Sequence, residues 1–309
     1  MSKIDKIEEL QNVLKEDQTN FQARRQLAVL LLDLGYSEEA KQHFLYLSKN
    51  FPDDSGIFYN LGITYEKLKD LDKAIKAYNK AIELAPAEID AYYNLGLVFI
   101  DKKLYEKAVD CFETVLQKDN TDSNAYFSIG LCYFKEGKLD GAKYYFQRTI
   151  ELNDEDLYAH FYLGNIFKEQ GDNENARKNF HRVLEISPDY SWAYFNLASI
   201  DYEEGNLTSA VKNLENTLEF NPKDIDAYTI YAKVLTKMQD LDKASAIIEQ
   251  ALQSCGENGD LYYILAQINK LSHQNDEYVQ NMGLALKNNS TLSVSPKSVK
   301  KELDKFLKA

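Results

Sequence analysis

Apolar side chains recur along most of this chain with a period of 34 residues. Within each period they fall three or four residues apart over two stretches. This spacing predicts two amphipathic helices, at about positions 1–14 and 18–31 of each repeat. The eight repeats begin at Phe21, Ser55, Ile89, Ser123, Leu157, Ser191, Ile225 and Gly259. No insertion interrupts the series, so we expect eight equal helix pairs.

Small residues occupy two positions of the repeat. The eighth position is glycine or alanine in all eight repeats, and the twentieth is alanine in seven, with Tyr278 in the last. A larger side chain would wedge two closely packed helices apart. The pattern therefore predicts a tight contact between the two helices of each pair, with the aromatic residues that are common at positions 11 and 24 filling the remaining space.

Glycine and proline mark the helix ends. Glycines at position 15, as in Gly35 and Gly137, can take the left-handed backbone conformation that stops the first helix. Four of the five prolines stand at position 32, as in Pro86, where they end the second helix. One helix pair cannot bury its own apolar face, so neighbouring pairs must stack.

This repeat resembles the tetratricopeptide repeat (TPR). The second repeat matches its pattern of aromatic, Leu-Gly, aromatic, alanine and proline residues through Phe58, Leu61, Gly62, Tyr65, Ala74, Tyr78, Ala81 and Pro86. The resemblance implies an all-α fold, a right-handed α-solenoid (superhelix) of antiparallel helix pairs. The repeats would span residues 21–54, 55–88, 89–122, 123–156, 157–190, 191–224, 225–258 and 259–292.

The flanking segments are expected to close the two ends of the stack. Residues 1–20 predict an N-terminal capping helix with one apolar face, made of Ile4, Ile7, Leu10 and Leu14. Residues 293–309 predict a C-terminal solvating helix that starts at Ser295-Pro296, an N-cap residue followed by proline at the first helical position. Its apolar residues would dock on repeat eight, and these are Val299, Leu303 and Phe306.

Composition narrows the classes of partner. The chain has 49 acidic and 36 basic side chains and a net charge of −13, which disfavours nucleic acid and anionic membranes. No stretch of 18 apolar residues could span a membrane, and the charged N-terminus lacks a signal peptide. The three cysteines have no redox or metal spacing and read as buried thiols in a reducing compartment. We therefore expect a soluble, cytoplasmic protein.

No combination of residues predicts catalysis. The four histidines fall at unrelated repeat positions without metal-ligand spacing, and the acidic residues lie in solvated helical runs. We expect no enzyme activity, no catalytic residue, no metal site and no cofactor. Asp201 stands at position 11, where an aromatic residue is usual, and no pattern in the sequence explains it.

The resemblance implies where a ligand would bind. In TPR proteins the first helix of each pair lines a concave groove through positions 2, 5, 6, 9, 12 and 13. Five consecutive repeats carry an aromatic ring at position 5, and a run of exposed rings favours binding. Packing against neighbouring helices is an equal alternative for each ring. The candidate peptide-binding residues are Tyr59, Asn60, Tyr93, Asn94, Phe127, Phe161, Asn165, Trp192, Phe195, Asn196, Lys168, Lys233, Lys237 and Lys270.

The leading hypothesis is a protein–protein interaction scaffold that holds an extended or helical segment of a partner protein in this groove. Rings in the middle of the groove would anchor the segment, Asn94 and Asn196 would hold its backbone, and the lysines would favour an acidic stretch or a C-terminal carboxylate. One alternative is a structural subunit that assembles through convex or end surfaces. Another is a stand-alone targeting module for an enzyme on a separate chain. The partners would be proteins or peptides, and a monomer is favoured.

Overall fold

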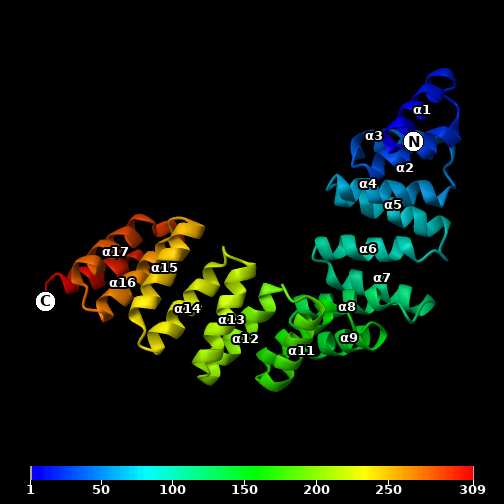
Figure 1. Cartoon of the computed structure of the whole chain (residues 1–309). Helices are drawn as coiled ribbons and strands as arrows, with labels where there is room; N and C mark the ends of the chain where they lie inside the picture. Colours follow the sequence, from blue (N-terminus) through cyan, green and yellow to red (C-terminus); the bar gives the residue numbers. More distant parts are fainter. Residues whose placement is uncertain (1, 309) are drawn as a thin grey trace. The chain divides into compact units, whose positions relative to one another are not determined.

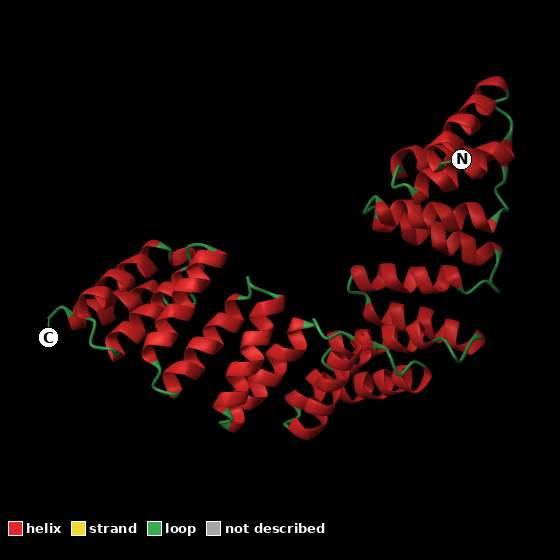
Figure 2. Cartoon of the chain, viewed as in Figure 1, coloured by secondary structure: helices red, strands yellow, loops and turns green. Residues whose placement is uncertain are grey.

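The structure is a computed structural model that describes residues 2–308. Within that range every regular element is helical, with eighteen α-helices and one short 3₁₀ helix (Figure 1, Figure 2). The chain forms two compact units, and the boundary between Ala159 and His160 falls inside α10 (Leu157–Glu169). The predicted all-α solenoid of helix pairs is confirmed.

The first unit contains nine complete helices, each packed against the next in the chain. The first helices of its pairs also contact one another, α4 with α6 and α6 with α8. The helices are α1 (Lys3–Glu16), α2 (Phe21–Asp33), α3 (Ser37–Asn50), α4 (Ser55–Lys67), α5 (Leu71–Leu84), α6 (Asp90–Asp101), α7 (Tyr105–Lys118), α8 (Ser123–Lys135) and α9 (Leu139–Leu152).

The second unit continues the same alternation, and α12 contacts α14 as α14 contacts α16. Its helices are α11 (Asn173–Ile186), α12 (Ser191–Glu204), α13 (Leu207–Phe220), α14 (Ile225–Lys237), α15 (Leu241–Cys255), α16 (Gly259–Leu271), α17 (Asn275–Lys287), η1 (Asn289–Thr291) and α18 (Pro296–Phe306). In each unit we call the surface formed by the first helices the first-helix face, and that formed by the second helices the second-helix face. Most first helices cover positions 1–13, one residue shorter than predicted. Most second helices cover positions 17–30, so they begin and end one residue earlier than predicted.

A left-handed residue stands between the two helices in all eight repeats. Position 15 has a positive φ at the four glycines, and also at Lys69, Lys103, Gln239 and His273, where φ lies between 57° and 64°. The backbone N–H of Lys69 donates to the carbonyl of Glu66, and that of Asp70 donates to the carbonyl of Tyr65, both at 2.9 Å. These bonds close the helix end. The turn is therefore a property of the repeat, and glycine only makes it less strained.

The close contact predicted at position 8 is made with the ring at position 24. A Cβ atom added to Gly96 would lie 2.7 Å from Phe112, and one added to Gly62 would lie 2.4 Å from Tyr78. Gly130 and Gly164 face Phe146 and Phe180 in the same way. In the last three repeats position 8 is alanine and position 24 is not aromatic; those pairs are Ala198 with Leu214, Ala232 with Ile248 and Ala266 with Met282.

Each terminal helix packs apolar residues against the neighbouring repeat. In α1, Ile7, Leu10 and Leu14 are buried, but Ile4 is 62% exposed, so the expectation that it shares the buried face is wrong. At the other end, Val299 of α18 is 1% exposed and the Phe306 ring lies 4.5 Å from that of Tyr278.

The cysteines differ from one another in burial. Cys111 and Cys132 are buried as expected, and burial raises the pKa of each thiol to about 12. Cys255 is only half-buried, because it stands at the last residue of α15, so the expectation of three buried thiols fails there.

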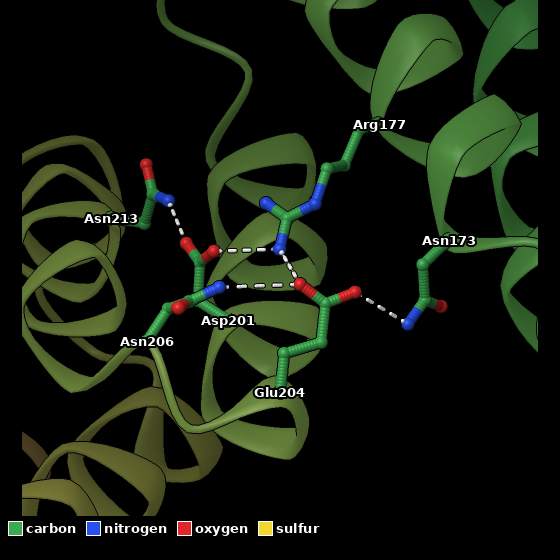
Figure 3. Close-up of polar contacts among 6 residues, drawn as sticks. All are labelled: Asn173, Arg177, Asp201, Glu204, Asn206 and Asn213. Atoms are coloured by element: carbon green, nitrogen blue, oxygen red, sulfur yellow. Dashed lines mark hydrogen bonds and ion pairs between the residues drawn. The ribbon is translucent and has the colours of Figure 1, made fainter.

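Asp201 is held by a polar network between three helices (Figure 3). It is 3% exposed, and its carboxylate accepts hydrogen bonds from Arg177 of α11 at 2.7 Å and from Asn213 of α13 at 2.8 Å. The same Arg177 nitrogen reaches Glu204 at 2.8 Å. A buried carboxylate is tolerated when it is paired in this way. Asp201 therefore joins repeat five to repeat six where an aromatic side chain would otherwise pack.

Candidate functional site

The rings at position 5 are half-buried, and in repeats two to five each packs on the ring at position 24 of its own repeat. Their other surfaces contribute to the first-helix face. The centroid distances are 6.1 Å for Tyr59 and Tyr78, 5.4 Å for Tyr93 and Phe112, 5.5 Å for Phe127 and Phe146, and 6.1 Å for Phe161 and Phe180. A loss of any one of these rings would therefore disturb packing as well as the surface.

In the first unit, three of the predicted residues come together around a small polar cavity. Tyr59, Tyr93 and Asn94 line about 160 Å³ together with acidic and amide side chains from α6 and α8. The Asn94 amide donates to the Tyr59 hydroxyl at 3.0 Å. Burial, with a further contribution from the carboxylate of Asp90, raises the pKa of Tyr59. The site offers hydrogen-bonding groups but little room.

The other predicted residues of this unit lie outside that cavity. Asn60 donates to the carbonyl of Gly56 in its own helix at 2.7 Å. The ring of Phe127 lies 6.4 Å from that of Tyr158 as well as packing on Phe146. The amide of Asn60 is thus directed along α4.

In the second unit, aromatic rings surround the start of α12. Phe161 packs on Tyr190 at 5.3 Å, and Trp192 packs on Phe195 at 6.1 Å with 48% of Trp192 exposed. Trp192 is the only tryptophan of the chain. It is the most exposed of the predicted aromatic residues and can act as a fluorescent reporter for this face.

The predicted amide Asn196 is already engaged by neighbouring groups. It is 8% exposed, donates to the carbonyl of Trp192 at 2.9 Å and accepts from the Lys168 amine at 3.0 Å. Burial lowers the pKa of Lys168. Lys168 therefore ties α10 to α12, and Asn165, also on α10, is half-buried.

A pocket on the first-helix face of this unit lies between α14 and α16. It has a volume of about 540 Å³, and its lining includes two lysines and no acidic residue. The residues that line it are Tyr202, Ala232, Lys233, Thr236, Lys237, Gln239, Tyr263, Ile264, Gln267, Ile268 and Leu271. A concave, mainly apolar site with a few polar groups is typical of a binding pocket. We call it the C-terminal pocket.

Two of the four predicted lysines meet at this pocket. Lys233 is exposed, and the Lys237 amine lies 5.0 Å from the centre of the Tyr202 ring. Lys270 instead binds Glu302 of α18 at 2.9 Å and lies over the Tyr278 ring. The four lysines therefore do not form one group, because Lys168 and Lys270 serve contacts between helices.

Glu302 receives hydrogen bonds from several side chains at the C-terminal end. Tyr263 donates to it at 3.2 Å, Gln267 at 3.2 Å and Lys270 at 2.9 Å. Burial alone would raise the pKa of Glu302, but the bonds from Lys270 and Gln267 outweigh it and lower that pKa. Because Tyr263 and Gln267 also line the C-terminal pocket, Glu302 fixes one of its walls.

Most of the pocket residues that the sequence analysis did not name stand at the expected groove positions. Tyr202 and Thr236 are at position 12, Ile264 at position 6, Gln267 at position 9 and Leu271 at position 13. Applying the same positional rule to apolar and amide side chains in the last three repeats would have found them.

Among residues 2–308, no group of three or more histidine, cysteine or acidic side chains is placed to hold a metal ion. Likewise, no helix of that part of the chain is long and apolar enough to cross a membrane.

Comparison with known proteins identifies the repeat. Residues 56–87, 89–122 and 123–156 match a family profile described as "Tetratricopeptide repeat", and residues 167–234 and 201–268 match a second profile of the same description. No curated protein sequence matches the chain.

Several solved structures are similar. The C-terminal part of a TPR repeat-containing protein from Cytophaga hutchinsonii is 21% identical with a TM-score of 0.66, covering 77% of this chain and 98% of that one. YrrB, described as a TPR protein with an unusual peptide-binding site, is 26% identical with a TM-score of 0.51, covering 60% and 95%. MamA from Desulfovibrio magneticus, from residue 41 to its end, is 25% identical with a TM-score of 0.53, covering 56% and 97%.

Proposed function

Since this chain belongs to the tetratricopeptide repeat family and is a protein-interaction scaffold, we propose that it binds an extended or helical segment of a partner protein on its first-helix face. We take the repeats to span residues 21–292, with capping segments on either side. The C-terminal pocket is the main anchor of the segment. The site performs no reaction, and its ligand is a peptide.

The observation that carries this proposal is the composition of the C-terminal pocket. Its walls are apolar at Tyr263, Ile264 and Leu271, and Leu271 is 56% exposed at the end of α16. An apolar side chain of the partner would cover this surface, and its burial is worth about 1.5–3 kcal/mol when complete. Lys233 and Lys237 would then hold an acidic side chain or a C-terminal carboxylate beside it.

The position-5 rings extend the site along the first-helix face of each unit. Tyr93, Phe127, Phe161 and Phe195 are half-buried, so each offers one surface to a ligand while packing with the other. Asn94 and Asn196 already bond to Tyr59 and Lys168, so they would hold the partner's backbone with their remaining N–H and oxygen sites or in exchange for these bonds. The likeness to YrrB, a TPR protein with a peptide-binding site, supports a peptide as the ligand.

Peptide selection with a displayed library of random C-terminal sequences tests the proposal. We expect each selected peptide to combine an apolar residue with an acidic residue or the free carboxylate. Its binding is measured from the change in Trp192 fluorescence or from the fluorescence anisotropy of the labelled peptide. Leu271→Ser should weaken binding about fivefold or more, as expected for a lost contact of about 1 kcal/mol. Leu152→Ser, at a 38% exposed leucine that ends α9, is the matched control.

The charged part is tested separately. Lys233→Ala with Lys237→Ala should weaken binding more at low than at high salt, because exposed charges are screened within about 8–10 Å. Lys212→Ala with Lys223→Ala, at two exposed lysines outside the pocket, gives the same change in net charge. Equal affinity of the selected peptides for the wild type and both pocket variants would move the binding site elsewhere and support assembly through other surfaces.

A third experiment tests the position-5 rings. Phe127→Ala with Phe161→Ala should also weaken binding, by about 1–2 kcal/mol for each true anchor. Both rings pack inside their repeats, so circular dichroism must show that the double variant is folded. Unchanged affinity in a folded variant would remove these rings from the site.

A further inference from the structure

A second cavity, in the first unit, lies on the second-helix face. It is bordered by α7, by Tyr133 near the end of α8 and by the turn that leads into α9, and it has a volume of about 350 Å³. Four of its lining residues are acidic, namely Glu106, Asp110, Glu113 and Glu136, and one is basic, Lys138. We call it the acidic cavity.

Tyrosine rings continue from this cavity along α8 and α9. The Tyr145 ring lies 5.3 Å from that of Tyr133, 5.2 Å from that of Tyr144 and 6.4 Å from that of Tyr126. Tyr144 is 56% exposed. Burial first, then nearby Tyr133 and the Glu113 carboxylate raise the pKa of Tyr145, and Glu113 lines the same cavity as Tyr133. The carboxylates and the Tyr133 ring thus border the same space, and the Tyr145 ring packs next to Tyr133.

In other repeats of this chain a lysine amine lies over the ring at position 11. In the second and third repeats a lysine at position 19 lies over the ring at position 11, Lys73 at 5.6 Å from Tyr65 and Lys107 at 5.8 Å from Phe99. In the fourth repeat position 19 is Gly141, and its backbone lies directly against the edge of Tyr133. No lysine can cover that ring from position 19.

Lys138 partly takes over this role from the turn. Its amine lies 5.6 Å from the centre of the Tyr133 ring and 2.9 Å from Glu136. Within residues 2–308, Glu106, Asp110 and Glu113 make no ion pair with any side chain. These three carboxylates are exposed and can accept hydrogen bonds from a cationic side chain of another protein.

We propose that the acidic cavity and the adjoining tyrosines bind an arginine side chain from a basic segment of a second partner protein. A guanidinium suits the site because it stacks on aromatic faces and donates to carboxylates in the same plane. The partner segment would be rich in arginine, since the chain's net charge of −13 also attracts it. This surface is separate from the C-terminal pocket, so the chain would bridge two proteins.

A matched pair of charge variants tests the location. Glu106 and Glu113 stand at positions 18 and 25 of their repeat, and Asp242 and Glu249 stand at the same positions of repeat seven. Tyr133 and Tyr145 stand at positions 11 and 23 of repeat four, which follows Glu106 and Glu113 in the chain. Repeat eight, which follows Asp242 and Glu249, has Asn269 and Asn281 at these two positions. One double variant, Glu106→Gln with Glu113→Gln, removes two charges next to the tyrosines. The other, Asp242→Asn with Glu249→Gln, removes two charges at equivalent positions that have no tyrosines nearby.

The probe is a fluorescein-labelled peptide in which six arginines alternate with serine, measured by anisotropy at about 0.15 M salt. Removing Glu106 and Glu113 should weaken its binding about fivefold or more, and the repeat-seven variant should leave it unchanged. Tyr145→Asn should weaken binding about two- to fivefold, as expected for a lost cation–π contact. Asparagine already occupies this position in three repeats, at Asn179, Asn213 and Asn281, so the fold accepts it.

Three results would overturn the proposal. The first is no binding of the arginine peptide to the wild-type protein. The second is an equal loss in the two charge variants, because that would show general attraction to an acidic chain. The third is unchanged binding in Tyr145→Asn, because the rings would then take no part. None of these outcomes affects the proposal for the C-terminal pocket, which uses different residues and a different probe.

Discussion

The contact between position 8 and position 24 can be tested by adding a single carbon atom. In Gly96→Ala the new Cβ would lie 2.7 Å from the Phe112 ring, which is completely buried, so the ring or α7 must move. Overpacking of this kind costs about 1–3 kcal/mol. Alanine is a better helix former than glycine by about 1 kcal/mol. We therefore expect a net loss of up to about 2 kcal/mol.

Gly283→Ala is the matched control. Gly283 lies within α17, and a Cβ added there would meet no atom within 4 Å. This variant should gain the helix propensity without the clash and be more stable than the wild type by about 0.5–1 kcal/mol. Urea unfolding followed by circular dichroism compares the two, with the slope checked because repeat proteins can lose two-state behaviour.

A double variant isolates the pair. With Phe112→Leu present, Gly96→Ala should become neutral or stabilising, since Ala198 already faces Leu214 at the equivalent positions. The coupling between the two sites should be about 1–3 kcal/mol. Gly96→Leu, with three further carbon atoms, should be worse than Gly96→Ala. If Gly96→Ala gains as much stability as Gly283→Ala, the assignment of position 8 as the point of closest approach is refuted.

Three further predictions concern single residues. Lys69→Gly should stabilise the protein by about 1 kcal/mol in urea unfolding, because its φ of 61° strains any residue with a side chain; a loss would contradict this reading. Asp201→Ala should cost about 1–3 kcal/mol by the same measurement, since the buried groups it satisfies lose their partner; an unchanged midpoint would count against a structural role. The lowered pKa of Glu302 means that its contribution to stability is complete above its usual value of 4.5 and is lost as pH falls through the lower folded-state value. Thermal unfolding from about pH 6 to about pH 3 should therefore show a steeper loss in the wild type than in Glu302→Gln, and parallel curves would disprove it.

The repeat and its helices could be predicted from sequence because their signals are local and recur eight times. Small residues at positions 8 and 20 and apolar residues at helical spacing each have one simple explanation. The left-handed turn at Lys69 could not be predicted in this way, because nothing local favours it. There the hydrogen bonds of the helix end, together with the packing of α4 on α5, impose a conformation that the residue itself disfavours.

The site was less predictable because it depends on pairs of residues far apart in the chain. Lys168 and Lys270 are at expected groove positions, yet they bind Asn196 and Glu302, which lie 28 and 32 residues away. The sequence places an aromatic ring at position 5 of five consecutive repeats, but it does not show how much of each ring packs inward. Asp201 departs from the repeat pattern in the sequence, but its ion pair with Arg177 of the preceding repeat is visible only in the structure.

The central claim, that a partner segment binds between α14 and α16, is tested most directly by site-specific photo-crosslinking. The photoreactive residue p-benzoylphenylalanine would replace Gln267, which lines the C-terminal pocket, or Gln253, which is exposed on α15. Each protein is irradiated with the peptide selected against the wild type, and the crosslinks are located by mass spectrometry. We predict a crosslink to the peptide from position 267 and none from position 253. Crosslinking from position 253 alone, or equally from both, would contradict the account.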